Sequence, residues 1–324
     1  MPARAAGSRG RGAARVGWRV GSQAGARLLE AALTLWLLAT LCFVLLRAAP
    51  GGPFDTEKAA PPEVQAALAA QYRLDQPLPA QYAAWLADVA RGDLGPSFQY
   101  PDYSVNQLVG AALPVSALNG GLALLLALAV GIVLGVWAAL RAGRWTDRGL
   151  LFAAGHGLAV PKCVAAPLLV LLFAGTLHWL PAGGWGDWEN VVLPVIALAL
   201  PNIAYCARLT RASMLETLSA DYLRAARARG YSETRLLFAH ALKPALLPVV
   251  AWLAPALINV VTGSVVVEQV FGIPGMGRYF VQGALNRDYT LVLGVVLVIG
   301  ALIVVITTLV DALRGWMDPR LERS

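Results

Sequence analysis

Six long apolar stretches decide what this chain can fold into. They lie near residues 28–47, 111–140, 149–180, 191–209, 244–270 and 290–312. A helix needs roughly 20 residues to cross a hydrocarbon core about 30 Å thick, so each stretch is long enough to span a membrane. Only 14% of the residues are charged, whereas a soluble domain has about 25%. The sequence therefore predicts an all-α polytopic membrane protein with six transmembrane helices, the third long enough to contain a break.

The distribution of lysine and arginine predicts the orientation in the membrane. Nineteen of the 26 basic residues fall within 1–27, 141–148, 208–243 and 314–323. Cytoplasmic segments carry an excess of Lys and Arg, so both chain ends are expected in the cytoplasm. The net charge of +7 follows from this bias; it suits a lipid bilayer with anionic headgroups and does not call for nucleic acid. The predicted parts are a basic cytoplasmic tail at 1–27, a first transmembrane helix at 28–47, an extracytoplasmic helical segment at 48–110, a transmembrane core at 111–312 with a cytoplasmic loop at 210–243, and a cytoplasmic tail at 313–324.

We expect two helices in the extracytoplasmic segment. Residues 61–72 begin with proline, which is favoured in a first helical turn, and residues 78–92 end at Gly92, a common helix terminator. Apolar and aromatic side chains of the second helix share one face at helical spacing: Tyr82, Trp85, Leu86 and Val89. Such a face either packs on neighbouring membrane helices or docks an external partner, and the sequence leaves both open.

A short basic helix interrupts the apolar pattern at residues 220–229. Four of its residues share one face by the three-and-four spacing rule: Tyr222, Ala225, Ala226 and Arg229. The two adjacent alanines allow the backbone of another protein to approach closely. A helix that rests on lipid headgroups would instead carry large apolar residues on its buried face, so the alanines favour protein docking.

Gly230 and Ser232 predict where this helix ends and where the next one begins. Gly230 can adopt a positive φ and stop a helix sharply. Ser232 is a preferred N-cap residue for a following helix. The expected result is a short, stiff helix presented to the cytoplasm, which suits the transmission of force because a flexible loop would absorb a partner's motion.

Several phrases of the sequence resemble one protein family. "RAARARG" followed by "HALKPALLP" resembles the EAA loop of permease subunits in ATP-binding cassette (ABC) importers: Ala225, Ala226 and Gly230 match its spacing, Arg224 stands where that family often has Glu, and His240 replaces the usual Ile. Within this binding-protein-dependent family the chain looks most similar to the first permease subunit of oligopeptide importers. That likeness covers about residues 28–320 and includes, in order, "APGGPF", "RGDLGPSF", "YSVNQLV", "FGIPGMG" and "ALNRDY".

The resemblance implies a type I ABC importer permease fold in a bacterial cytoplasmic (inner) membrane. It also implies the partners: a second homologous permease subunit, two cytoplasmic ABC ATPase subunits, an extracytoplasmic peptide-binding protein and the peptide substrate. The EAA loop would dock into the ATPase subunits, which would bind ATP and Mg²⁺, and this chain would bind no cofactor. The coupling residues that the resemblance implies are Asp221, Tyr222, Arg224, Ala225, Ala226, Arg229 and Gly230, of which Ala225, Ala226 and Gly230 match the family's spacing.

The sequence itself argues that ATP hydrolysis occurs on another chain. A phosphate-binding loop ends in Gly-Lys-Ser/Thr, but Lys58, Lys162 and Lys243 are followed by Ala, Cys and Pro. We therefore expect a non-catalytic subunit that binds no cofactor. The three cysteines, Cys42, Cys163 and Cys206, show neither disulfide nor metal-site spacing, so no metal is expected.

Polar residues within the apolar stretches are candidates for a translocation path. Lys162 falls near the middle of the third stretch, where a cation costs about 2.5–3.5 kcal/mol. It either attracts a substrate carboxylate or, where Pro161 breaks the helix, contacts trapped water or a lipid headgroup. The fifth stretch adds Asn259, Thr262, Ser264 and Glu268, which either line the path or make interhelical hydrogen bonds.

Other transporter classes fit less well. A proton-coupled secondary transporter carries acids deep in several helices and often shows inverted repeats, whereas Glu30, Glu268 and Asp311 lie near the ends of apolar stretches. A permease for dipeptides, nickel complexes or another small solute stays open as the alternative to oligopeptides.

Overall fold

The computed structural model describes residues 9–48 and 73–317, and this part of the chain is a helical bundle without β-strands. Five helices are long and apolar enough to cross a membrane, and a bent pair supplies a sixth span if it counts as one. The predicted all-α fold is therefore confirmed; the expected helix at 61–72 lies outside the described residues. The helices are α1 (Arg9–Ala48), α3 (Leu78–Ala90), α4 (Val105–Leu140), α5 (Trp145–Ala159), α6 (Lys162–Leu169), α7 (Trp188–Leu218), α8 (Asp221–Ala228), α9 (Glu233–Arg235), α10 (Leu242–Phe271), α11 (Met276–Leu285) and α12 (Tyr289–Met317), with π-helical turns η1 (Val170–Thr176) and η2 (Leu236–Ala241).

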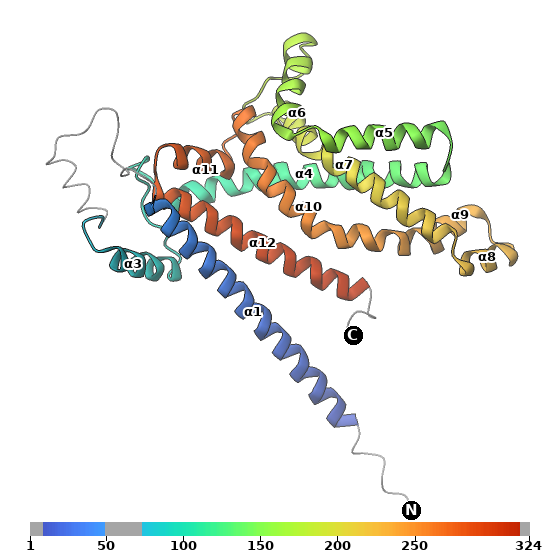
Figure 1. Cartoon of the computed structure of the whole chain (residues 1–324), viewed down its shortest axis with the longest axis horizontal. Coiled ribbons are helices and arrows are strands. Elements are labelled where there is room, and N and C mark those ends of the chain that lie inside the picture. Colours follow the sequence, from blue (N-terminus) through green and yellow to red (C-terminus); the bar gives the residue numbers. More distant parts are fainter. Residues whose placement is uncertain (1–8, 49–72, 318–324) are drawn as a thin grey trace, which may run out of the picture.

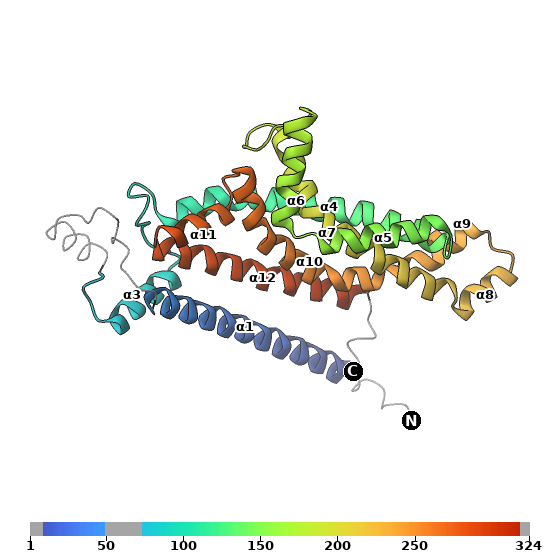
Figure 2. The same cartoon turned by 45° about the horizontal axis from the view of Figure 1, so that its top comes forward.

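The long helices run side by side, and the short helix α6 projects from the middle of the bundle (Figure 1). Helices α3 and α11 lie at one end, whereas α8 and α9 lie at the other (Figure 2). The C-terminal end of α12 and the N-terminal end of α1 point toward the α8 end. These two helix ends and the basic helix α8 therefore lie toward the same end of the bundle.

The third apolar stretch is broken, as its length allowed. Helices α5 and α6 meet at 104°. Pro161 precedes α6 in extended conformation, and a proline cannot supply the backbone N–H that would continue α5. Helix α6 leaves the bundle steeply (Figures 1 and 2), so the first residue of α6, Lys162, lies at the break.

Small residues bring α4 and α7 into close contact. A Cβ added to Gly131 would lie 2.6 Å from Cys206 Cβ, and one added to Gly135 would lie 2.6 Å from the Ala207 carbonyl oxygen. Both glycines are buried on the same face of α4 because they are four residues apart. The two glycines therefore serve helix packing.

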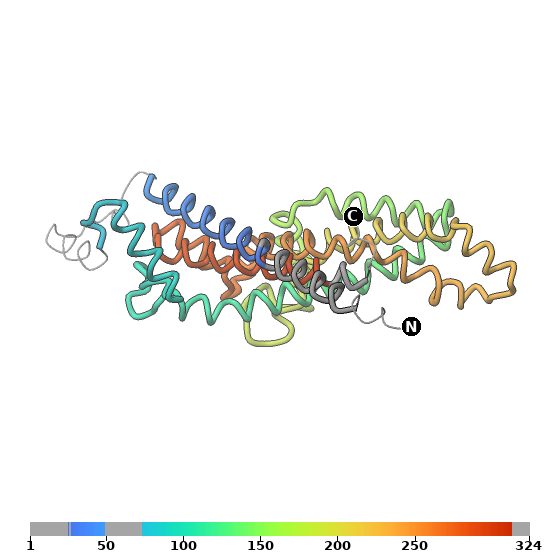
Figure 3. Tube along the Cα trace, turned by 90° about the horizontal axis from the view of Figure 1, so that it is seen from below, coloured from blue at the N-terminus to red at the C-terminus, as the bar shows by residue number. Residues whose placement is uncertain are grey.

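Helix α1 lies along the outside of the bundle against α12 (Figure 3). A Cβ at Gly300 of α12 would lie 2.6 Å from a methyl group of Leu38. At the far end of α1, Phe43 contacts the rings of Tyr82 and Trp85 in α3 at centroid distances of 5.2 and 5.8 Å. The aromatic face of α3 therefore packs on a membrane helix, one of the two interpretations that the sequence left open.

Asp288 fixes the loop end of the bundle. Its side chain is fully buried and accepts hydrogen bonds from the Phe98 and Gln99 amides at 3.1 and 3.0 Å. Its other oxygen accepts the Leu291 amide at 3.0 Å, so the same carboxylate caps the first turn of α12. Nearby, Ser104 and Gln107 form a capping box at the start of α4. The phrases "RGDLGPSF", "YSVNQLV" and "ALNRDY" thus fold into one junction.

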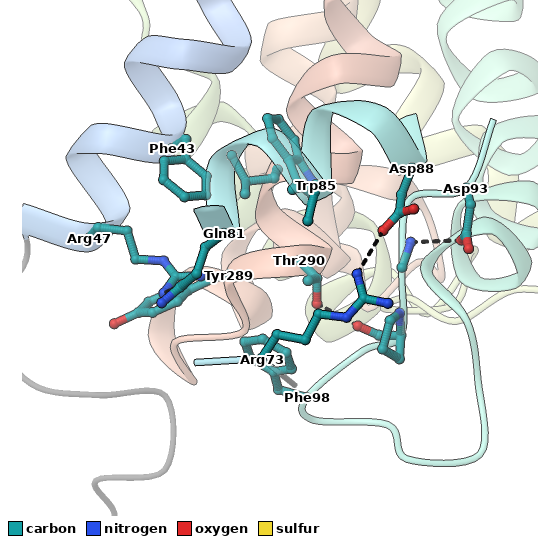
Figure 4. Close-up of a pocket in the computed structure, with 14 residues that line it drawn as sticks. Phe43, Arg47, Arg73, Gln81, Trp85, Asp88, Asp93, Phe98, Tyr289 and Thr290 are labelled. Atoms are coloured by element: carbon teal, nitrogen blue, oxygen red, sulfur yellow. Dashed lines mark hydrogen bonds and ion pairs between the residues drawn. The ribbon is translucent and has the colours of Figure 1, made fainter. Parts of the chain in front are cut away.

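Beside this junction is a half-open cavity of about 280 Å³ between α1, α3 and the start of α12 (Figure 4). Arg47 lies over the rings of Phe43 and Tyr289, each 5.2 Å from the guanidinium carbon, and donates a hydrogen bond to Gln81. On the opposite wall Arg73 pairs with Asp88 at 3.6 Å. These contacts connect α3 to the membrane helices.

Candidate functional site

One buried leucine anchors helix α8 to the bundle. Leu223 is fully buried within a cluster that also contains Met214 of α7, Leu236 of η2 and Ala245 of α10. Burial of a leucine side chain stabilises by about 1.5–3 kcal/mol. A displacement of α8 therefore acts directly on two membrane helices.

The C-terminal end of α8 closes as the sequence predicts. Gly230 has φ +81°, its amide donates to the Arg227 carbonyl oxygen at 2.9 Å, and the Tyr231 amide donates to the Ala226 carbonyl oxygen at 3.4 Å. This pair of bonds is a Schellman motif, which needs the left-handed conformation that glycine adopts without strain. Ser232 then accepts the Arg235 amide, confirming it as the next N-cap.

Side-chain contacts brace α8 against the chain that follows it. Arg227 donates two hydrogen bonds to Glu233, at 2.7 and 3.2 Å, and this carboxylate raises the pKa of the guanidinium. The Tyr222 hydroxyl donates to the His240 carbonyl oxygen at 3.3 Å. The ring of Tyr231 stacks on the ring of His240 at a centroid distance of 5.6 Å. Helix α8 and the approach to α10 thus form one braced unit.

The exposed face of α8 differs from the predicted one at a single residue. Tyr222 is 50% exposed, and Ala225 and Arg229 are also exposed. Ala226 is half-buried against the cluster that holds Leu223. The reason is helical spacing: Ala226 follows Leu223 by three residues and therefore points inward with it. The open face is Tyr222, Ala225 and Arg229, flanked by an Asp221–Arg224 ion pair of 3.3 Å.

The structure divides the five candidate path residues into two groups. Lys162 donates from Nζ to the backbone and side-chain oxygens of Asn259, at 2.9 and 2.6 Å. Asn259 and Thr262 lie on an exposed face of α10. Ser264 and Glu268 are instead buried, at 5% and 1% exposure. The polar residues of α10 therefore face two directions.

Glu268 is the centre of a buried hydrogen-bond network. Its Oε1 accepts the Ser116 hydroxyl of α4 and its Oε2 accepts the Gly277 amide of α11, both at 2.7 Å. Ser116 in turn accepts the Met276 amide at 2.9 Å. The start of α11 thus faces a carboxylate, which the positive end of a helix dipole stabilises. For Glu268, the geometry is the interhelical hydrogen bonding that the sequence left as one of two readings.

Sequence reasoning did not find the reason for the glycines in "FGIPGMG". A Cβ at Gly275 would overlap the Glu268 carboxylate, and one at Gly277 would overlap the backbone of Val265. Gly272 adopts φ +66° where α10 ends. The signal was present as an acid placed seven residues before a Gly-x-Gly pair, but spacing alone does not reveal a closed turn.

No group of three His, Cys, Asp or Glu side chains in the described segments has the geometry of a metal site.

Residues 131–323 match the model of a family described as "Binding-protein-dependent transport system inner membrane component". The chain is 48% identical to the oligopeptide transport system permease protein OppB of Salmonella typhimurium and 47% identical to OppB of Escherichia coli K12, over 91% of this chain and 97% of each relative. It is 40% identical to the dipeptide transport system permease protein DppB of Bacillus subtilis, over 91% of this chain and 96% of that one.

The chain belongs to the family of inner membrane components of binding-protein-dependent transport systems. An inner membrane component of this kind is a transporter subunit, and the five to six candidate spans of this chain fit a multi-pass membrane protein. It has the type I importer permease fold that the motifs implied.

Proposed function

We propose that this inner membrane component is the permease subunit of an ABC importer for oligopeptides, and that α8 couples it to a separate ATPase. The observation that carries the proposal is the construction of α8. One face is buried through Leu223, and the opposite face exposes Tyr222, Ala225 and Arg229. A short helix of this kind can receive a partner's movement and pass it to α7 and α10.

The other residues predicted to couple the chain to an ATPase also lie on α8 or at its end. Asp221 and Arg224 form an ion pair on the open side of α8, and Gly230 ends the helix. Ala226 contributes by allowing close packing beneath α8 and not by contact with a partner. The ATPase subunits would supply ATP and Mg²⁺, and this chain would hold neither.

The identities favour oligopeptides as the substrate class. Two relatives named for oligopeptide transport are 47–48% identical to this chain, whereas the relative named for dipeptide transport from Bacillus subtilis is 40% identical. The machine would also contain a second, homologous permease subunit and an extracytoplasmic peptide-binding protein. Dipeptides or another small solute remain the second candidate because the two kinds of relative match over the same share of the chain.

The proposal includes an orientation, with the basic segments and α8 in the cytoplasm. At the α8 end of the bundle, Lys and Arg gather in Arg141, Arg144 and Arg148 and in the α8 segment, and the sequence adds nine arginines in residues 1–27 and 313–324. By the positive-inside rule, this distribution supports a cytoplasmic position for the α8 end. The ATPase would then meet α8 on the side where nucleotide is available.

Crosslinking within the assembled importer tests the coupling role. The variant Ala225→Cys places a thiol on the open face, and Ala87→Cys places one on an exposed position of α3 at the opposite end. With a short thiol-reactive crosslinker and peptide mapping, we expect Ala225→Cys to join an ATPase subunit and Ala87→Cys not to. Crosslinks from Ala225→Cys to lipid alone would contradict the proposal.

Reconstitution tests the transport role. Vesicles that contain this chain, the second permease and the ATPases, with binding protein outside, should accumulate a radiolabelled pentapeptide only when ATP is enclosed. A dipeptide serves as the comparison substrate. Uphill uptake by this chain alone would point to a secondary transporter.

A further inference from the structure

Lys162 is held in place by uncharged oxygens. Its Nζ donates to two oxygens of Asn259 at 2.9 and 2.6 Å, and the side chain crosses α10 at Gly263, where an added Cβ would overlap it. Lys162 belongs to α6 and Asn259 to α10. Because Gly263 has no side chain, the Lys162 side chain can lie across α10 at this position.

The described residues provide no counter-ion for the Lys162 ammonium. Among residues 27–48 and 73–312, no carboxylate lies within ion-pair distance of Lys162. A lysine ammonium has three N–H donors, and Asn259 accepts from two of them. One N–H donor therefore remains for another group, and the contacts that Lys162 makes in the described structure are to uncharged oxygens.

Lys162 contacts the middle part of α10. Its partner Asn259 lies twelve residues before the end of α10 at Phe271 and seventeen residues after its start at Leu242, distances of about 18 and 25 Å along the helix. A hydrocarbon core is about 30 Å thick, so a residue in the middle part of a spanning helix is expected far from both headgroup layers.

Helix stability does not explain a lysine at this position. Lys162 is the first residue of α6, where the helix dipole is positive and disfavours a cation. An anion bound beside Lys162 would offset both the cost of a central cation and the cost of this placement, because the ammonium and the positive end of α6 attract the same charge.

The residues around Lys162 face outward from the subunit. Asn259 and Thr262 are exposed on α10, and Cys163, the neighbour of Lys162, is exposed on α6. Polar groups at mid-depth are expected to face a protein-lined or water-filled space and not lipid. An incoming solute in such a space would meet the ammonium directly.

We propose that Lys162 binds a carboxylate of the peptide in transit, with Asn259 as the positioning residue that holds the ammonium toward the path. The proposal rests on the proposed function, because it assigns a binding point on the route of that substrate. Ammonium–carboxylate hydrogen bonds are charge-assisted and about twice as strong as neutral ones. A peptide with a free C-terminal carboxylate should therefore be favoured over its amide.

Uptake by the reconstituted importer tests the preference. We compare a tripeptide of neutral side chains with its C-terminal amide, using wild type, Lys162→Gln and Lys162→Arg. The binding protein is a separate chain, so its own preference cancels when a variant is compared with wild type. We expect the acid-to-amide uptake ratio to fall at least five-fold in Lys162→Gln and to persist in Lys162→Arg. An unchanged ratio in Lys162→Gln overturns the proposal.

Labelling of Cys163 tests the same site without transport and without a variant. We measure the ratio of the reaction rates of an anionic and a cationic methanethiosulfonate. We expect this ratio to be at least five-fold higher for Cys163 than for a free thiol in solution. The free-acid tripeptide should slow the anionic reagent more than the amide does, as read by mass spectrometry of the intact importer. The proposal is overturned if the anionic-to-cationic rate ratio is the same for Cys163 and for the free thiol. It is also overturned if added anionic lipid, and not the peptide, slows the reaction of Cys163. Failure of the proposed function is separate: the wild-type importer would then accumulate neither peptide.

Discussion

The amide of Gly277 donates a 2.7 Å hydrogen bond to the buried carboxylate of Glu268. This contact joins the end of α10 to the start of α11, and Ser116 brings α4 to the same carboxylate. A buried charge without partners would be very costly, so the turn between these helices is built around it. The turn is therefore a rigid connection between three membrane-adjacent elements.

The first prediction follows from the tight packing of Gly275 against Glu268 in this turn. Gly275→Ala should destabilise the protein because its Cβ would displace the Glu268 carboxylate. Overpacking costs about 1–3 kcal/mol, and a weakened hydrogen bond to a charged group adds about 1.5–3 kcal/mol. The thermal unfolding temperature of the purified importer measures the effect. Gly149→Ala is the control because nothing lies within 4 Å of its added Cβ; equal stability of the two variants would contradict the structure.

The second prediction separates the anchor of α8 from its open face. Leu223→Ala should cost about 2–5 kcal/mol, because it leaves a cavity in the cluster beneath α8. We expect uptake to fall further than ATPase binding, since α8 would remain present but poorly held. Leu285→Ala is the control, because Leu285 is 75% exposed at the opposite end of the bundle. Loss of ATPase binding and uptake in equal proportion would assign Leu223 to docking and not to force transmission.

Much of the fold could be predicted because membrane helices and their caps are local. The apolar runs predicted the long helices, and Gly230 and Ser232 predicted the break after α8 because glycine and serine have specific backbone preferences. A helix can extend beyond its apolar run: α4 begins at Val105, ahead of the apolar stretch at 111–140, because the Ser104–Gln107 capping box starts it within a more polar segment. A hydropathy pattern does not reveal a helix start that is set by a capping box.

The candidate sites were only partly predictable because their contacts are long-range. The position of Lys162 within an apolar stretch predicted contact with a polar group, but its partner Asn259 is 97 residues away, and only the fold brings the two together. Likewise Glu268 and Asn259 belong to one helix and face different directions. The inward turn of Ala226 was within reach of the sequence, since Leu223 precedes it by one helical turn.

The third prediction concerns the junction around Asp288. Asp288→Asn replaces one carboxylate oxygen with an amide nitrogen, which cannot accept the amides of both Phe98–Gln99 and Leu291. Loss of an acceptor for buried donors costs about 1–3 kcal/mol. Hydrogen exchange should therefore quicken in the 93–100 loop and the first turn of α12. Asp102→Asn, at an exposed position of the same region, should leave these rates unchanged, and similar rates in both variants would show that Asp288 does not hold the loop.

The contact between α4 and α7 gives the last prediction. Gly131→Ala would place a Cβ 2.6 Å from Cys206 Cβ and 3.1 Å from the Ile203 carbonyl oxygen, so the two helices must separate. Overpacking of this kind costs about 1–3 kcal/mol, and the displacement should also loosen Cys206, which is fully buried. A thiol reagent should therefore modify Cys206 faster in Gly131→Ala than in wild type. Gly155→Ala is the control because nothing lies within 4 Å of its added Cβ; if it exposed Cys206 as much, the close crossing of α4 and α7 would not be what protects this thiol.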